Sequence, residues 1–395
     1  MIIFGIKIDN INKSALMEKI NEFLVGEKQH FIVTPNPEFL LEAGKDEEFF
    51  YILNQADLAL PDGIGLKFAG WAMGENLARI AGADLVPEIL KLAEDKILKI
   101  GIINWAGGLS KKEDIENILK QKFSKLNFMV CDVDRNAVET HNYASLHAFN
   151  PTILFVTLGA PYQEKFIYYN LKNLPSVKLA MGVGASFDYI SGKARRAPQI
   201  MRNLGLEWLW RLFGALSGQK NRGRRIYNAV VKFTLKFLKW RFILPWLYRP
   251  SVACLLYKKE GEQYKILIVR RAEAKDEHWQ LPQGGTNHEN IETAGRRELS
   301  EELNCDKFKT VSTFKNLFKY KFPQNMAGQK HDGYKGQTQS LFIAEFTGQD
   351  SDIKINFWDH TDWKWIDAES LAEKVYPVRR ESAEIFLEKF YSLKN

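Results

Sequence analysis

The hydrophobic pattern divides the chain into two regions of different organisation. Across residues 1–192, short apolar runs bounded by turn residues alternate with segments of helical periodicity. The apolar runs, which predict strands, are 2–8, 30–36, 58–63, 98–105, 128–133, 152–161 and 177–185. The helical segments are 14–25, 37–54, 84–94, 110–123 and 162–172. This alternation predicts a mainly parallel sheet with helices on both faces, an α/β domain.

Turn residues gather where the predicted strands end. In parallel sheets, ligands bind at these carboxyl ends. Gly and Pro at strand ends are also ordinary turn formers, and each one alone is better explained that way. The polar side chains beside the turns weigh against that explanation; they are Thr34, Asn36, Asp62, Gln163 and Glu164. We therefore expect substrate-binding loops at this edge of the sheet.

Residues 193–249 form a strongly basic segment between the two regions. It holds fourteen Lys and Arg and one acid, Glu207, a net charge of +13, whereas the whole chain carries +7. Such a concentration of charge predicts an anionic partner: phosphate, nucleic acid or lipid head groups. From 226 to 244 the spacing is helical, and Pro245 ends it. One face of this helix carries Ile226, Val230, Phe233, Phe237, Trp240 and Leu244. It suits an anionic membrane surface, and the alternative is packing on its own domain.

Composition and the pattern of cysteines limit the number of domains and the cellular environment that we expect. A chain of 395 residues with 45% hydrophobic content predicts two or three folded domains. Cys131, Cys254 and Cys305 include no CxxC pair, which favours a reducing cytoplasm over a disulfide framework. We find no signal peptide and no apolar run long enough for a spanning helix, so the expected location is cytoplasmic.

Several motifs of the first region occur in the order typical of one enzyme family. They are VTPNPEFLLEA, ADLALPDGIGLKFA, RIAGADLVP, LFVTLGAPYQEKFI, MGVGASFDYISGKARRAP and LGLEWLWRL. Over roughly residues 1–245 the chain resembles the WecG/TagA/CpsF glycosyltransferases. The resemblance implies a Rossmann-like fold. It also implies transfer of an N-acetylmannosamine-type sugar from a UDP-sugar donor to a polyprenyl-diphosphate-linked GlcNAc acceptor, at the inner face of the cell membrane.

The resemblance also assigns residues to the transferase site. It implies that Asp62 is the general base, because a sugar hydroxyl becomes nucleophilic only as its proton leaves. It places in the donor and acceptor pocket Thr34, Asn36, Arg79, Asp84, Gln163 and Glu164. Without it, Arg79 and Asp84 are better explained as a surface ion pair. Arginines for the diphosphate follow in the basic segment: Arg196 and Arg211 by motif, and Arg222, Arg224 and Arg225 by type and rough position.

The first region contains one candidate metal-binding motif, Asp132-Val133-Asp134, which follows a predicted strand. Two carboxylates two residues apart can share one hard cation. The family it resembles works without such a motif, and this segment departs from the family's Gly-rich pattern. We therefore favour a solvated acidic turn and expect no cofactor for the transferase.

The region from about residue 250 has a different pattern. Segments 251–257 and 264–270 predict two strands, and the loop WQLPQGG follows at 279–285. Beyond it, Glu298, Glu301 and Glu302 fall at i, i+3 and i+4 of a predicted helix and share one face. Three carboxylates on one face repel one another unless a cation compensates their charge. A bound Mg²⁺ or Mn²⁺ ion would do so, and such ions normally bridge to substrate phosphates. The alternative is a solvated acidic face.

This stretch resembles the Nudix box, written GX5EX7REUXEEXGU. The resemblance implies a Nudix α/β/α sandwich that hydrolyses a nucleoside diphosphate-X phosphoanhydride with a divalent metal. Glu289 precedes Arg297 by the required seven-residue gap, and we expect the two to pair and hold the Gly284-Gly285 loop. Two features depart from the box. Only four residues separate Gly284 from Glu289, and Asn304 stands in place of the last Gly.

Motifs beyond the box narrow the second resemblance. YKFP at 320–323, YKGQTQ at 334–339, DWKW at 362–365 and YPVRR at 376–380 are similar to the RNA 5′-pyrophosphohydrolase and dinucleoside-polyphosphate hydrolase branch. This implies that Asp359, where the branch places an extra acid, is a general base or metal ligand. Arg270 and Arg271 are candidates for phosphate contacts, or else an edge-strand charge pair.

The sequence thus predicts an α/β transferase core at 1–192, a basic appendage at 193–249 and a Nudix domain at 250–395. Our first hypothesis is a bifunctional enzyme associated peripherally with the membrane. In a second, the basic segment binds RNA, the Nudix domain acts on RNA 5′ ends or dinucleoside polyphosphates, and the first domain is a degenerate scaffold. A third makes the Nudix domain a nucleotide sensor. Nucleic acid is a partner only in the second hypothesis, and a homo-oligomer is compatible with all three.

Overall fold

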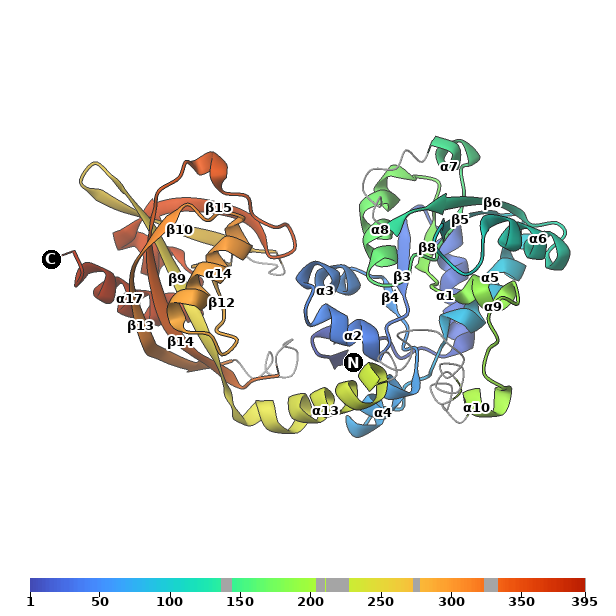
Figure 1. Ribbon diagram of the computed structural model, residues 1–395, viewed down its shortest axis with the longest axis horizontal. Helices are drawn as coiled ribbons and strands as arrows, with labels where there is room; N and C mark the ends of the chain where they lie inside the picture. Colours follow the sequence, from blue (N-terminus) through green and yellow to red (C-terminus); the bar gives the residue numbers. More distant parts are fainter. Residues whose placement is uncertain (136–143, 204–209, 211–226, 273–277, 323–332, 395) are drawn as a thin grey trace. The chain divides into compact units, whose positions relative to one another are not determined.

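The computed structural model describes residues 1–135, 144–203, 210, 227–272, 278–322 and 333–394 (Figure 1). The chain forms two compact units, Met1–Lys239 and Trp240–Asn395. Each unit has its own sheet and its own hydrophobic core, and we describe each by itself.

The first unit is built on a six-stranded sheet of order β4-β3-β8-β7-β5-β6. All neighbouring strands are parallel, as the strand–helix alternation predicts. The strands are β3 (His30–Val33), β4 (Leu58–Ala59), β5 (Lys99–Trp105), β6 (Asn127–Val133), β7 (Ile153–Val156) and β8 (Leu179–Gly182). The apolar run at 2–8 does not join this sheet. It forms a separate antiparallel hairpin, β1 (Ile2–Ile3) and β2 (Ile6–Lys7), because Phe4 and Gly5 both have positive φ and turn the chain.

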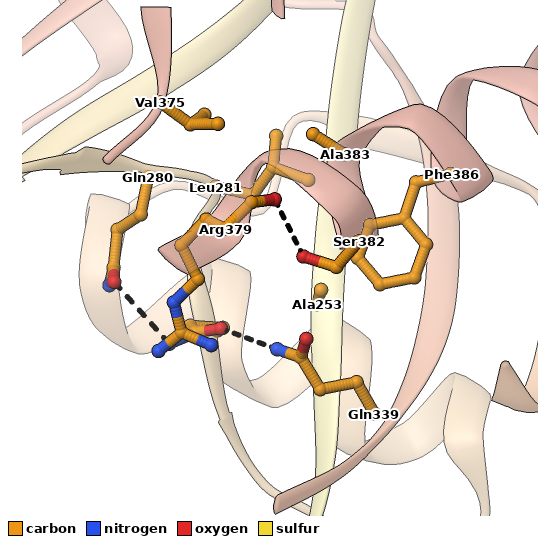
Figure 2. A pocket seen from close by; sticks show the side chains of 10 residues that line it. Ala253, Gln280, Leu281, Gln339, Val375, Arg379, Ser382, Ala383 and Phe386 are labelled. Carbon is orange, nitrogen blue, oxygen red and sulfur yellow. Dashed lines mark hydrogen bonds between the residues drawn. The ribbon is translucent and has the colours of Figure 1, made fainter. Parts of the chain in front are cut away.

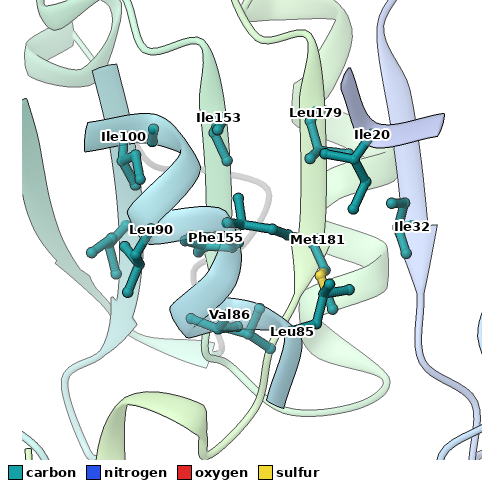
Figure 3. Packing of buried hydrophobic residues seen from close by; sticks show 14 of the residues in the cluster. Ile20, Ile32, Leu85, Val86, Leu90, Ile100, Ile153, Phe155, Leu179 and Met181 are labelled. Carbon is teal, nitrogen blue, oxygen red and sulfur yellow. The ribbon is translucent and has the colours of Figure 1, made fainter. Parts of the chain in front are cut away.

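Helices cover this sheet and bury its apolar side chains. The helices are α1 (Lys13–Val25), α2 (Pro37–Ala43), α3 (Glu47–Asn54), α4 (Ile64–Ala72), α5 (Gly82–Asp95), α6 (Lys112–Lys122), α7 (Ala144–Phe149), α8 (Tyr162–Asn170), α9 (Ser186–Ile190), α10 (Gln199–Asn203) and α13 (Phe233–Leu238). In Figure 3, Leu85, Val86 and Leu90 of α5 pack against Phe155 and Met181 of the sheet. The predicted helix 37–54 is two helices, because Asp46 caps a new helix by accepting from the Phe49 amide.

The helical stretch after residue 227 buries the apolar face that we assigned to the membrane. Phe233 and Phe237 are fully buried in the first unit, and the Phe233 ring lies 5.7 Å from that of Phe4. Between residues 227 and 238 the exposed apolar residues fall on a different face: Tyr227, Val231, Leu235 and Leu238. Packing on the protein therefore accounts for Phe233 and Phe237 of the predicted face, while Ile226 lies outside the described residues. Within the described residues, no helix has both the length and the hydropathy needed to cross a membrane.

The second unit is a sandwich of helices around a mixed sheet. The sheet has the order β11-β10-β9-β14-β13, with β12 paired to β9 and β15 to β10, and only β9 and β14 are parallel among the described strands. The strands are β9 (Tyr248–Glu260), β10 (Gln263–Arg271), β11 (Trp279–Gln280), β12 (Gln283–Gly285), β13 (Phe308–Lys321), β14 (Gly336–Phe346) and β15 (His360–Asp367). The helices are α14 (Ile291–Leu303), α16 (Leu371–Lys374) and α17 (Arg380–Tyr391).

Strand β9 shows why this sheet needs a layer on each side. Ala253, Leu255 and Tyr257 enter the core that contains Phe386 and Phe390 of α17. The residues that alternate with these along β9 enter the core that contains Leu299 and Leu303 of α14; they are Val252, Cys254 and Leu256. Side chains alternate between the two faces of a strand, so a run that is apolar at every position must be covered on both. The result is the predicted α/β/α sandwich.

Candidate active sites

The loops after β3 and β4 lie together at the carboxyl edge of the first sheet. The Asp62 amide donates to the Pro35 carbonyl at 2.8 Å, and the Ile80 amide donates to the Pro61 carbonyl at 3.1 Å. These bonds bring the predicted base close to the segment that carries Arg79. Asn36 caps α2, since its side chain accepts from the Glu38 and Phe39 amides at 2.9 and 3.1 Å. Thr34 is buried and faces the start of α5, where a Cβ on Gly82 would lie 3.5 Å from its Oγ1.

Gln163 and Glu164, at the start of α8, are both buried. Gln163 Oε1 accepts from the Gly159 amide at 3.1 Å and the Gly184 amide at 3.0 Å, which ties the loops after β7 and β8 together. Its Nε2 donates to Glu164 Oε1 at 2.7 Å. Burial raises the pKa of Glu164 to about 8, although the bond from Gln163 opposes that rise. Glu164 therefore supports Gln163 from inside the fold rather than facing the open edge of the sheet.

Asp84 is the centre of an arginine cluster. Arg196 Nη2 donates to its Oδ2 at 2.8 Å, and Arg202 Nη1 donates to its Oδ1 at 3.1 Å. Burial alone would raise the pKa of Asp84, but the hydrogen bond from Arg196 and the charges of Arg196, Arg202 and Arg79 outweigh burial and lower it. Arg79 Nη1 donates to the Arg202 carbonyl at 2.8 Å, so Arg79 helps to position Arg202.

A pocket of about 240 Å³ opens beside this cluster. It is lined by Ile64, Lys67, Arg79, Ala81, Asp84, Gln199 and Arg202. Three of its lining side chains are cationic and one is acidic, so the pocket suits an anionic group such as a diphosphate. Among our site predictions, the structure brings together Arg79, Asp84 and Arg196. The sequence did not single out Lys67 or Arg202, although Arg202 lies six residues beyond Arg196 in the basic segment.

The remaining predictions for the first unit have different outcomes. Asp132 Oδ1 accepts from Asn104 Nδ2 at 2.9 Å, and Asn104 Oδ1 accepts from Thr157 Oγ1 at 3.1 Å. Asp132 is therefore part of a hydrogen-bond network across β6, β5 and the end of β7. Four predicted arginines lie outside the described residues: Arg211, Arg222, Arg224 and Arg225.

In the second unit, Arg297 organises the acidic face of α14. Its Nε donates to Glu289 Oε2 at 2.9 Å, which is the pair expected from the sequence. Its Nη1 donates to Glu298 Oε1 at 2.8 Å and to Glu301 Oε2 at 2.9 Å, and its Nη2 donates to the Gly285 carbonyl at 2.8 Å. One guanidinium therefore fixes the loop, its glutamate and two of the three helix carboxylates.

Each of the two glycines of the loop lies against a charged side chain. A Cβ on Gly284 would lie 1.9 Å from Glu298 Oε2, and one on Gly285 would lie 2.6 Å from Arg249 Nη2. Glu298 is buried in the space that Gly284 leaves. Burial raises its pKa, and the adjacent Arg297 opposes that rise.

Both departures from the Nudix box have a local structural explanation. The short loop between Gly284 and Glu289 contains two consecutive residues with positive φ, Asn287 at 49° and His288 at 69°. Asn304 ends α14 with φ of 45°, the left-handed conformation for which glycine is usual and asparagine is tolerated. Its Nδ2 also donates to the Lys354 carbonyl at 2.7 Å. Asn304 therefore adopts the conformation that the missing glycine would have.

Glu302, the third carboxylate, lies next to a histidine that the sequence reasoning missed. Its Oε1 accepts from the Gln283 amide at 3.3 Å, and His360 Nε2 lies 3.7 Å from its Oε2. Burial and the nearby positive charge of Arg271 lower the pKa of His360 to about 3. The imidazole is therefore neutral at pH 7. Asp359, the predicted acid, immediately precedes it and accepts from the Ala272 amide through its carbonyl.

On the face of the second sheet opposite α14, arginine and amide side chains lie close together. Arg379 donates to the Tyr320 hydroxyl, which in turn donates to Gln337 Oε1 at 2.7 Å. Burial raises the pKa of Tyr320, and the positive charges of Arg379, Arg271 and Arg249 oppose that rise. Figure 2 shows Gln280, Gln339 and Arg379 lining a small cavity here, with Gln339 Nε2 bonded to Gln283 Oε1 at 2.8 Å. Arg379, Tyr320 and Gln337 are thus joined by hydrogen bonds beside this cavity.

The donor set of α14 fits a hard divalent cation, because Glu298, Glu301 and Glu302 are oxygen ligands on one helix face. Their present arrangement is different. Within the described residues, no three His, Cys, Asp or Glu side chains are gathered as a metal site. Arg297 engages two of the carboxylates instead. If Glu298 and Glu301 held a metal, these carboxylates would bind it together with, or in place of, the guanidinium of Arg297.

Fold and sites together define an enzyme with a parallel α/β transferase unit followed by an α/β/α hydrolase unit. The sequence matches the glycosyl transferase WecG/TagA/CpsF family over residues 1–245 and the NUDIX domain over residues 247–387. The chain belongs to the WecG/TagA/CpsF glycosyltransferase family and carries a Nudix hydrolase domain, a type that generally depends on divalent metal ions.

Relatives of the first unit agree with this assignment. The chain is 32% identical over 215 residues to the N-acetylglucosaminyldiphosphoundecaprenol N-acetyl-β-D-mannosaminyltransferase of Bacillus subtilis. The aligned residues make up 53% of this chain and 82% of that relative. It is 32% identical over 232 residues to the enzyme of the same name from Staphylococcus aureus, with 56% and 86% covered. Among solved structures, an Ap4A hydrolase from C. elegans is 18% identical and has a TM-score of 0.29, covering 36% of this chain and 98% of that one.

Proposed function

We propose that the first unit transfers an N-acetylmannosamine-type sugar from a UDP-sugar to a GlcNAc linked through diphosphate to a polyprenyl carrier. The observation that carries this proposal is the cationic pocket around Asp84, whose lining begins at Ile64, two residues after Asp62. The names of the relatives match, since they describe an N-acetylglucosaminyldiphosphoundecaprenol acceptor and an N-acetyl-β-D-mannosaminyl group.

Within this site each group has a separate task. Asp62 accepts the proton of the attacking hydroxyl, as a carboxylate positioned beside an acceptor sugar can do. Arg79, Arg196 and Arg202 stabilise diphosphate charge without needing a metal, because arginine stays protonated and binds phosphate through two hydrogen bonds. Thr34, Asn36 and Gln163 shape the loops that surround the donor and acceptor.

Release of UDP from UDP-ManNAc tests this function, with GlcNAc-diphosphate-polyprenol as acceptor and with or without EDTA. The wild-type chain should release UDP in both conditions, and Asp62→Asn should lose at least about a hundredfold in rate. Asp57→Asn is the matched control, because Asp57 precedes β4 whereas Asp62 follows it, and the Asp57 carboxylate accepts from the Phe31 amide at 2.8 Å. Wild-type activity in Asp62→Asn would contradict the assignment of the base.

We propose that the second unit hydrolyses a phosphoanhydride of a nucleotide bearing several phosphates. Glu298, Glu301 and Glu302 would hold Mg²⁺ or Mn²⁺, which when bound supplies an activated water and neutralises phosphate charge. Arg271 and Arg379 bind the remaining phosphates, and Asp359 is the proposed base. The cluster of arginines around Tyr320 supports a substrate of high negative charge, such as a dinucleoside polyphosphate or a triphosphorylated RNA end.

A hydrolysis screen over diadenosine polyphosphates, nucleotide sugars and triphosphorylated RNA, with Mg²⁺ or Mn²⁺, tests the second activity. We expect Glu301→Gln and Glu302→Gln to reduce hydrolysis of the preferred substrate at least about a hundredfold. Glu292→Gln is a matched control on the same helix, in its first turn. Equal hydrolysis by the wild type and both variants would contradict the metal site.

We also propose peripheral association of the enzyme with an anionic membrane on the cytoplasmic side. The face that supports this proposal is Tyr227, Val231, Leu235 and Leu238, flanked by Lys232 and Lys239. Flotation with anionic vesicles should fall when Leu235 and Leu238 are replaced by Ser. Undiminished flotation would remove this face from the proposal.

A further inference from the structure

Helix α4 carries an exposed apolar face directly after Asp62. Ile64, Phe68 and Trp71 are 38%, 44% and 73% exposed, and their spacing of i, i+4 and i+7 places them on one side of the helix. The Phe68 and Trp71 rings lie 6.3 Å apart. The opposite side, with Leu66, Ala69 and Gly70, is buried. Single exposed apolar residues are ordinary, but a row that includes two aromatic side chains indicates a binding surface.

The same helix lines the cationic pocket. Ile64 and Lys67 form part of its wall, together with Arg79 and Arg202. From Ile64 the apolar face continues to Trp71, seven residues further on and about 10 Å along the helix axis. A positively charged pocket therefore opens onto an apolar strip. That combination matches a ligand in which a diphosphate is bonded directly to a hydrocarbon chain.

We propose that the apolar face of α4 binds the first part of the polyprenyl chain of the acceptor, while the pocket binds its diphosphate. This inference rests on the proposed transferase function and adds a role for residues that bear no charge. Lys67 lies where the two chemistries meet, on the same exposed side as Ile64 and Phe68. In this arrangement the acceptor is selected by its lipid as well as by its sugar.

The test compares two acceptors in detergent solution: GlcNAc-diphosphate on a polyprenyl chain, and the same group on a short alkyl chain. We expect the double variant Phe68→Ser with Trp71→Ser to raise KM for the polyprenyl acceptor about tenfold. Its KM for the short-chain acceptor and its kcat with both acceptors should stay within about twofold of wild type. Val25→Ser, at an exposed residue that ends α1, is the matched control and should change neither KM.

Each other outcome has a distinct meaning. Equal changes of KM for the two acceptors would overturn the role of α4 and leave the transferase function standing. Unchanged kinetics with weaker flotation on vesicles would assign this face to the bilayer, which also overturns the proposal. If the wild-type chain releases UDP with neither acceptor, the transferase function fails and this inference falls with it. Melting curves of the double variant separate all of these outcomes from misfolding.

Discussion

The two candidate sites are assembled in opposite ways. The hydrolase site comes mainly from one continuous stretch, in which the Gly284-Gly285 loop and helix α14 are joined through the hydrogen bonds of Arg297. The pocket of the transferase unit combines residues as far apart in sequence as Ile64 and Arg202. The first arrangement depends on local spacing along a helix. The second depends on the tertiary fold that brings α4, α5 and α10 together.

This difference decides how each site responds to substitution. In a contiguous site, one added atom acts directly on a functional side chain. In an assembled site, the same atom can be absorbed by a shift of one segment relative to another. Gly284→Ala tests the contiguous site, with UDP release as its internal control because both activities belong to one chain. Two further substitutions measure how single residues in each unit contribute to stability.

The largest effect is expected from Gly284→Ala. The new Cβ would lie 1.9 Å from Glu298 Oε2, so the carboxylate must move away. A displacement of about 1 Å at a catalytic group costs about a hundredfold in rate. We expect a loss of this size in kcat/KM for phosphoanhydride hydrolysis and unchanged UDP release. Hydrolysis at the wild-type rate would show that the close approach of Gly284 to Glu298 is not required.

An intermediate effect is expected from Glu164→Gln, and it depends on pH. The folded pKa is raised to about 8 from an ordinary 4.5, so between these values the unfolded carboxyl is ionised while the folded one keeps its proton. The wild type should therefore lose about 1.4 kcal/mol of stability per pH unit as pH rises through this window. Glu164→Gln should lack this dependence. Hydrogen exchange of the β7 and β8 amides at about pH 5 and about pH 7 measures it, and parallel slopes would refute the assignment.

The smallest effect is expected at Asn304. Alanine at φ of 45° costs about 1 kcal/mol relative to glycine, because its Cβ crowds the following carbonyl. Asparagine has the same Cβ, but the hydrogen bond from its side chain to the Lys354 carbonyl offsets that crowding. Asn304→Ala should therefore lower the melting temperature more than Asn304→Gly does. Glycine keeps the conformation but loses the bond to the Lys354 carbonyl, so it should fall between wild type and alanine. Identical melting temperatures for the two variants would show that the left-handed conformation contributes little.

Much of the fold follows from periodicity. The apolar runs predict the six parallel strands of the first unit and a strand at 251–257, which is part of β9. The two layers that cover β9 were expected only from the resemblance to the Nudix fold. The hairpin at Ile2–Lys7 was mistaken for a strand of the main sheet. Its turn requires positive φ at Phe4, a conformation that a phenylalanine in the sequence does not indicate.

The candidate sites also contain some residues that the sequence predicted and others that it did not. The Arg297–Glu289 pair and the shared face of three glutamates follow from spacing within and just before α14. Arg202, Lys67 and His360 could not be selected, because nothing local distinguishes them from other charged or polar residues. The inward face of the helix after residue 227 was assigned to the membrane for a related reason. Amphipathic periodicity shows that a face is apolar, but it does not show what covers the face.

The hydrogen bonds of Arg297 have a consequence for the folding of the hydrolase unit. An arginine that already neutralises Glu298 and Glu301 removes most of the repulsion that would otherwise strain α14. Folding and metal loading are then separable equilibria. A chelator should abolish hydrolysis while the melting temperature stays nearly constant, unlike in small zinc domains, where the ion holds the fold together.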